Sequence, residues 1–139
     1  MIPSTHHGSW RGRNSLWLEP GKPPAVSEAT MEAGADLLSW RWSFDGGARE
    51  GSLRLFGPAP SLRAQFADTF HAAAGLALHG FVREGRLMLY GTYATGEGQP
   101  EWGWRLELDW ADPGALVLRM FNLEPSGVEE IAVDLRAGR

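Results

Sequence analysis

The sequence predicts an all-β protein whose sheet closes into an antiparallel up-and-down barrel. Apolar and polar residues alternate with a period of two along most of the chain, which is typical of strands that bury one face. Eighteen Gly and nine Pro supply turns between these segments and argue against a helical bundle. About nine or ten short strands with little helix to cover them must remove their sheet edges by closing or folding over. A β-sandwich is the alternative architecture.

The composition fits one domain spanning residues 1–139, of which residues 1–8 are expected to be flexible. Seven Trp, six Phe and two Tyr can bury a substantial core. The absence of Cys excludes disulfides, a thiol nucleophile and thiolate metal sites.

Charge and hydropathy argue against two classes of partner. The net charge of −4 comes without a basic stripe, which a nucleic-acid binder needs to meet phosphates. No apolar run approaches the roughly 20 residues of a membrane helix, and Met1–Ser9 lacks the pattern of a secretory signal. We therefore expect a cytoplasmic protein that binds neither nucleic acid nor membrane.

The first strands are separated by clear turn signals. Trp10–Leu18 and Ala25–Met31 are predicted strands divided by the turn-rich segment Pro20–Pro24. A third strand ends at Phe44, where Asp45-Gly46-Gly47 is a strong hairpin signal, and its return strand stops at Gly57-Pro58.

The stretch from Ser61 to Ala74 fits two structures. Its alanines favour a helix that begins near Pro60-Ser61, whereas Leu62, Phe66 and Phe70 follow the alternation of a strand. The strand is the preferred interpretation. Further strands are predicted at about 75–82 and 86–94, joined by Glu84-Gly85.

The clearest strand is Trp102–Trp110, which has two different faces. The apolar face consists of Trp102, Trp104, Leu106, Leu108 and Trp110. The opposite face consists of Gly103, Arg105, Glu107 and Asp109. After a turn at Asp112-Pro113-Gly114, the same alternation continues through Met120 and again from Ile131 to Leu135.

Several phrases of the chain resemble those of a known family. They are Gly8-Ser9-Trp10-Arg11-Gly12, Phe66-Ala67-Asp68-Thr69-Phe70-His71, Tyr90-Gly91-Thr92-Tyr93, Trp102-Gly103-Trp104-Arg105-Leu106-Glu107 and Phe121-Asn122-Leu123. Together they resemble a bacterial domain-of-unknown-function family with a lipocalin-like (calycin) β-barrel. The resemblance extends from about Gly8 to Arg136, departs from the family pattern at Phe66 (Trp expected) and Thr69 (Ser expected), and implies a closed antiparallel barrel but no established activity.

The segment Asp68–His71 is the first candidate site. A histidine can donate or accept a proton near neutral pH, and Asp68 is a nearby acid. Neighbouring positions on a strand point apart, so Asp68 and His71 can meet only where the strand bends or ends. The alternative is a strand end at which Asp68 caps the backbone and His71 lies in water.

The strand Trp102–Trp110 is the second candidate. If its Trp face points inward, Trp102 and Trp104 would line an aromatic slot for a flat ligand. If the other face points inward, Arg105 would clamp a carboxylate with Glu107 beside it. Two alternatives involve no ligand: the Trp face forms an ordinary apolar barrel core with the charges of the other face in water, or the Trp residues lie outside, at a dimer interface.

Three further residues carry weaker signals. Tyr93 offers a phenol as a hydrogen-bonding handle, and Asn122 interrupts an apolar run. A haem-binding interpretation would use His79 as the axial ligand, but the four His show no metal-binding spacing outside the N-terminus. We expect no cofactor and no metal.

These observations favour a barrel that binds a small apolar or aromatic molecule in its interior. The ligand-binding candidates are Asp68, His71, Tyr93, Trp102, Trp104, Arg105, Glu107 and Asn122. An isomerase, lyase or hydrolase that uses His71 and Asp68 is one alternative, although no nucleophile elbow or phosphate loop is present. A structural homodimer without ligand is the other.

Overall fold

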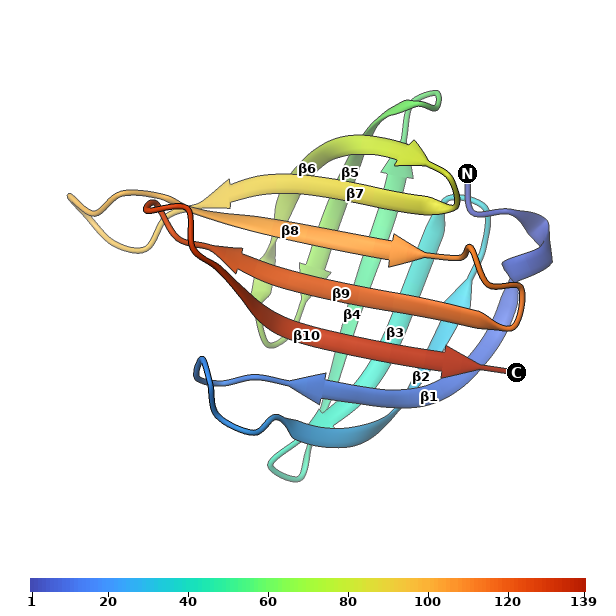
Figure 1. Ribbon diagram of the computed structural model, residues 1–139, viewed down its shortest axis with the longest axis horizontal. Helices are drawn as coiled ribbons and strands as arrows, with labels where there is room; N and C mark the ends of the chain where they lie inside the picture. The colour runs from blue at the N-terminus through green and yellow to red at the C-terminus, as the bar shows by residue number, and fades with distance from the viewer.

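The computed structural model describes residues 1–139 and is a single closed barrel of ten antiparallel strands (Figure 1). The strands follow one another around the barrel in chain order, and β1 pairs with both β2 and β10, so no sheet edge remains. The predicted up-and-down barrel is confirmed and the sandwich is excluded. The elements are η1 (Ser4–His6), β1 (Gly8–Leu16), β2 (Ala25–Ala33), β3 (Leu37–Phe44), β4 (Gly47–Phe56), β5 (Ser61–Asp68), β6 (Ala72–Arg83), β7 (Arg86–Tyr93), β8 (Trp102–Asp109), β9 (Ala115–Leu123) and β10 (Glu129–Gly138).

Two of the predicted hairpins have two-residue turns with left-handed backbone. Asp45 and Gly46 join β3 to β4 with φ values of 52° and 74°, and Glu84 and Gly85 join β6 to β7 with 52° and 77°. Positive φ at both central residues matches the twist of paired strands, and glycine in the second position adopts it at no steric cost.

The stretch that fitted both helix and strand contains no helix. Ser61–Asp68 is β5, residues 69–71 turn the chain, and β6 begins at Ala72, slightly earlier than the sequence indicated. The alternating apolar residues determine the outcome, because each finds a place in the barrel interior that a helix here would not fill.

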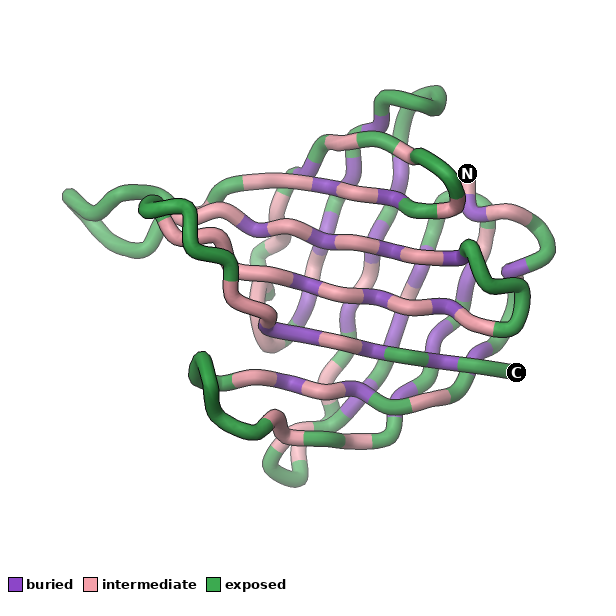
Figure 2. Tube along the Cα trace, in the orientation of Figure 1, coloured by how far each residue is buried: buried purple, intermediate pink, exposed green.

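Buried residues alternate with more exposed ones along most strands, as the banding in Figure 2 shows, and the buried side chains form one core. Leucine is the commonest residue of this core, and Trp40 stacks on Phe66 with ring centroids 6.2 Å apart. Both of these aromatic side chains are almost completely buried, so they occupy the centre of the barrel with apolar surface.

One end of the barrel is closed by the N-terminal segment, which the sequence suggested to be flexible. Ile2 and His6 are buried, and His6 stacks on Trp10 at 5.4 Å. His6 Nε2 lies 3.0 Å from the carbonyl oxygen of Asp112, and the indole N–H of Trp10 donates to the carbonyl of His6. Packing against the barrel therefore orders this short segment, although its own sequence has no strong structural signal.

Replacing Ile2 by Ala tests this closure. We expect Ile2→Ala to lower the free energy of unfolding by about 2–4 kcal/mol, because it leaves a cavity under the closed end. Urea denaturation provides the measurement, and Ser4→Ala, at an exposed position of the same segment, is the control with an effect below about 0.5 kcal/mol. Equal midpoints for both variants and the wild type would mean that the segment does not close the barrel.

Candidate functional site

A cavity of about 500 Å³ lies at the end of the barrel opposite to η1. It is formed where β5 meets β6 and where β7, β8 and β9 approach their outer loops, at the end away from both termini (Figure 1). Nine of its twelve lining residues are hydrophobic. The lining consists of Phe66, Phe70, His71, Ala72, Ala73, Ala74, Gly75, Leu76, Tyr93, Ala94, Trp104 and Asn122.

Small residues and an irregular register leave room for this cavity. The start of β6 is a run of three Ala followed by Gly75, so one wall has almost no side chains. β5 pairs with β6 at Phe66–Leu76 and again at Asp68–Ala72, so one residue of β5 opposes three of β6. Such bulges bend a strand and re-aim its side chains, and they are common beside functional sites.

Asp68 ends β5 and turns the chain back toward the barrel interior. Its Oδ1 accepts hydrogen bonds from the backbone N–H groups of Phe70 at 2.8 Å and His71 at 3.1 Å. The carboxylate is almost completely buried, and its Oδ2 has no partner. Asp68 therefore caps the end of a strand, which was one of the two roles expected for it.

This turn brings His71 against Asp68. The Nδ1 atom of His71 lies 3.3 Å from Oδ1 of Asp68, at ion-pair distance but not aligned for a hydrogen bond. The imidazole is largely buried among aromatic rings, with centroids 4.8 Å from Phe70, 5.3 Å from Trp104 and 6.3 Å from Trp42. His71 is therefore not a solvated side chain. The two groups meet because the strand ends at Asp68.

The surroundings of Asp68 keep its carboxylate ionised. Burial raises the pKa of Asp68, but the contact with His71 and the two backbone hydrogen bonds lower it more, so the pKa lies below its ordinary value. The Nδ1 side of the imidazole therefore faces a negative charge.

The apolar face of β8 points inward. Trp104 is buried and stacks on Phe66 at 6.0 Å, and Trp102 is half-buried nearer the rim. The indole N–H of Trp104 is enclosed without a hydrogen-bond partner. The Trp face therefore lines the interior, and it is not available as a dimer interface.

Tyr93 and Asn122 meet across β8 at the cavity. The Tyr93 hydroxyl donates to Oδ1 of Asn122, and the Tyr93 ring packs edge-on against Trp104 at 6.4 Å. Burial raises the pKa of Tyr93 above 10.0, which keeps the phenol neutral. The hydrogen bond leaves the amide N–H groups of Asn122 and the phenol oxygen free to meet a ligand.

Arg105 and Glu107 lie on the outer face, so the structure does not bring them together with the cavity. Arg105 Nε is 3.2 Å from Glu107 Oε1, and its guanidinium also pairs with Glu129 and covers the ring of Phe121 at 4.2 Å. The hydrogen bonds to Glu129 raise the pKa of Arg105. The interior carboxylate clamp is thus excluded, because the large indoles of the opposite face fill the interior.

Two inward-facing polar residues were missed by the sequence analysis. Arg49 lies opposite Trp42 in the β3–β4 hairpin, with its guanidinium 5.5 Å from the Phe70 ring and an enclosed, unpartnered Nε. Asn14 is buried on β1, and neither of its amide atoms has a partner. The alternation of strand faces was the available signal, because residues an even number of positions apart point to the same face. Arg49 has this spacing from buried Leu53, and Asn14 has it from buried Trp10.

His79 does not face the interior. It is exposed on β6, where it pairs with Arg63 and Tyr90 of the neighbouring strands. The haem interpretation required this histidine inside the barrel, so the geometry does not support it. The structure contains no group of three or more His, Asp or Glu side chains that could hold a metal ion.

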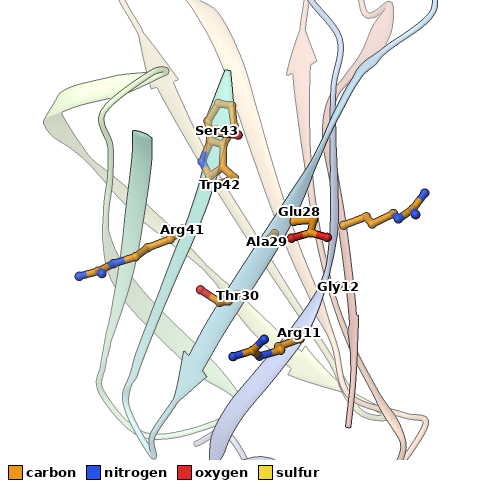
Figure 3. A pocket seen from close by; sticks show the side chains of 9 residues that line it. Arg11, Gly12, Glu28, Ala29, Thr30, Arg41, Trp42 and Ser43 are labelled. Carbon is orange, nitrogen blue, oxygen red and sulfur yellow. The ribbon is translucent and has the colours of Figure 1, made fainter. Parts of the chain in front are cut away.

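An outer groove runs along the seam between β2 and β3, whose pairing extends from Ala33–Leu38 only to Thr30–Arg41 (Figure 3). Only Ala29 and Trp42 among its nine lining residues are hydrophobic. Arg41 points away from Arg11 and Thr30 in Figure 3 and lies 4.0 Å from Glu50. Trp42 is the groove's single aromatic lining residue, whereas the cavity at the barrel end has nine hydrophobic lining residues, so that cavity is the stronger candidate.

Neither a scan of protein-family models nor a search of curated proteins found a match to this chain. No helix in the structure is long and apolar enough to cross a membrane.

Replacing Asp68 by Asn tests the strand-end geometry. We expect Asp68→Asn to lower the free energy of unfolding at neutral pH by about 1–3 kcal/mol, because the charged hydrogen-bond acceptor is lost. The lowered pKa means that the carboxylate stabilises the fold above its ordinary pKa of 3.8, and that this contribution is lost as the pH falls through the lower folded-state value. Denaturation of both proteins between about pH 7 and pH 3 should show the difference shrinking on acidification. A constant difference would contradict the ionised carboxylate.

Proposed function

We propose that this barrel binds a small, flat, apolar or aromatic molecule in the cavity at its open end. The observation that carries the proposal is the cavity of about 500 Å³ with nine hydrophobic lining residues of twelve. Binding sites for small molecules are typically concave, mostly apolar and furnished with a few polar groups. Trp104, Phe66 and Tyr93 provide flat or edge-on aromatic surfaces for such a ligand.

The polar groups support an oriented ligand over a non-specific one. His71, Tyr93 and Asn122 all line the same cavity, and each offers an atom that the protein itself does not use. Of the eight residues that the sequence suggested for ligand binding, these three and Trp104 belong to the proposed site. Asp68 supports it through His71, and Trp102 lies nearer the rim. Arg105 and Glu107 are left out, because they face outward.

The same architecture supports the resemblance to the lipocalin-like family. A closed antiparallel barrel is what that resemblance implies, and we propose membership in such a family on that basis. The argument for a homodimer from an outward Trp face does not hold, because that face points inward.

Filling the cavity tests the binding proposal. Titration with an apolar fluorescent probe such as anilinonaphthalene sulfonate should show saturable binding to the wild type. Ala72→Leu adds bulk to the cavity wall and should weaken probe binding at least about tenfold. Ala77→Leu, the same change at an exposed position of β6, is the matched control and should leave binding unchanged. Absence of saturable binding by the wild type, or equal affinity for both variants, would contradict the proposal.

Acid–base catalysis is the second candidate function, favoured by the distance of 3.3 Å between His71 and Asp68. A carboxylate behind Nδ1 orients an imidazole so that Nε2 can take or give a proton at a substrate in the cavity. This arrangement fits an isomerase, lyase or hydrolase that acts on an apolar substrate.

Proton exchange tests the catalytic candidate. A histidine base should accelerate deuterium exchange into an enolisable aromatic ketone or the hydrolysis of a nitrophenyl ester, by about 10²–10⁴-fold. NMR and absorbance measure the two rates, and His71→Phe should return both to the rate in buffer. His79→Phe, on the outer face, should retain the activity. If wild type and His71→Phe react alike, His71 is not a catalytic base for these substrates.

A further inference from the structure

We infer that the ligand of the cavity is an aromatic molecule with one O–H or N–H group, a phenol or an N–H heterocycle, which donates a hydrogen bond to Nε2 of His71. The inference rests on the proposed function and specifies its ligand class. It follows from the two nitrogen atoms of one imidazole, which lie in different surroundings.

The first nitrogen, Nδ1, is enclosed and lies 3.3 Å from the Asp68 carboxylate. A carboxylate accepts but does not donate hydrogen bonds when ionised, so it favours the tautomer with the proton on Nδ1. The other oxygen of Asp68 has no partner, and no arginine or lysine lies within ion-pair distance of it. His71 is therefore the group that meets this buried negative charge.

The second nitrogen, Nε2, is left as an acceptor toward the cavity. Nε2 makes no hydrogen bond within the protein and is not fully enclosed. His71 lines the cavity. In the neutral imidazole with its proton on Nδ1, Nε2 presents a lone pair. A purely apolar ligand would cover this acceptor and leave it unpaired, whereas a ligand with a donor would pair with it, so the second kind of ligand binds more tightly.

The other polar atoms of the cavity agree with a hydroxyl group. The Tyr93 hydroxyl already donates its hydrogen bond to Asn122, so the cavity offers a second acceptor, the phenol oxygen, and the amide N–H donors of Asn122. A ligand hydroxyl can donate to one acceptor and accept from a donor at once. His71 and Tyr93 both pack against Trp104, at 5.3 Å and 6.4 Å, so a ligand on Trp104 lies within the reach of both.

An anionic ligand fits these contacts less well. Asp68 is ionised and lies directly behind the imidazole, so a carboxylate at Nε2 would face a second negative charge. The guanidinium of Arg49 lies beside this cluster, 5.5 Å from the centroid of the Phe70 ring. A carboxylate is therefore the competing ligand class, and the experiment includes it.

Three naphthalene probes separate these classes. The wild type is titrated at about pH 7 with 2-naphthol, 2-methoxynaphthalene and 2-naphthoate, with Trp fluorescence or calorimetry as the readout. We expect 2-naphthol to bind about tenfold more tightly than 2-methoxynaphthalene, the amount that one hydrogen bond contributes, and more tightly than 2-naphthoate. His71→Phe keeps an aromatic ring but removes Nε2, so it should reduce the naphthol-to-methoxynaphthalene ratio to about one. His79→Phe, at an exposed position, should leave the ratio unchanged.

The outcomes distinguish this inference from the proposed function. Equal affinity for naphthol and methoxynaphthalene, or a preference for naphthoate, overturns the inference and leaves binding of flat apolar molecules intact. Failure of all three probes to bind overturns both. NMR of ¹⁵N-labelled histidine in the wild type gives a readout that needs no variant, because naphthol should shift the His71 Nε2 resonance whereas methoxynaphthalene should not. An unchanged Nε2 resonance with bound naphthol also overturns the inference.

Discussion

The barrel closes where the first strand of the chain pairs with the last. β1 pairs with β10 from Arg11–Gly138 to Leu16–Val133, and with β2 along its whole length. Gly12 makes the close approach feasible, because a Cβ at this position would lie 1.7 Å from the carbonyl oxygen of Arg136. Closure removes both sheet edges and gives every strand an inside and an outside, so the alternating pattern of the sequence becomes a core and a solvated wall.

Closure also makes the two ends of the barrel different. At one end η1, Ile2 and Trp10 fill the opening with large side chains, and a hydrogen bond from Trp10 holds the segment in place. At the other end, the alanines that begin β6 and the irregular register with β5 leave the opening unfilled. The cavity is thus a consequence of where small side chains fall in a closed wall, next to large aromatic rings that cannot collapse into it.

The polar chemistry of the cavity arises from the end of a single strand. β5 carries Asp68 inward, and its carboxylate binds the next backbone N–H groups, which reverses the chain and returns His71 to the same place. A buried carboxylate requires such partners, because its desolvation is otherwise too costly. The same contacts that satisfy Asp68 therefore orient the imidazole. Structural capping and the proposed ligand contact are two effects of one turn.

The residue pattern predicts the strands, most of their turns and the two faces that each strand presents. The alternation from Trp102 to Trp110, for example, separates indoles from charges whatever the rest of the chain does. It could not determine which face turns inward, because that depends on neighbours across the sheet, and Trp104 is inside while Arg105 bonds to Glu129 outside. The alternation along β4 places Arg49 on the inner face, but the polar residues that flank it in the sequence made an inward orientation hard to predict.

The tertiary structure alone decided the contacts between distant segments. The meeting of Asp68 with His71 depends on the residue at which β5 ends, and local pattern leaves that boundary uncertain by a few residues. The order in residues 1–8 depends on packing against β1 and on a contact with Asp112, which lies 106 residues from His6. Short-range alternation specifies which side chains share a face. The position of a cavity depends instead on the side-chain volumes that all strands contribute to the barrel interior, so no single segment determines it.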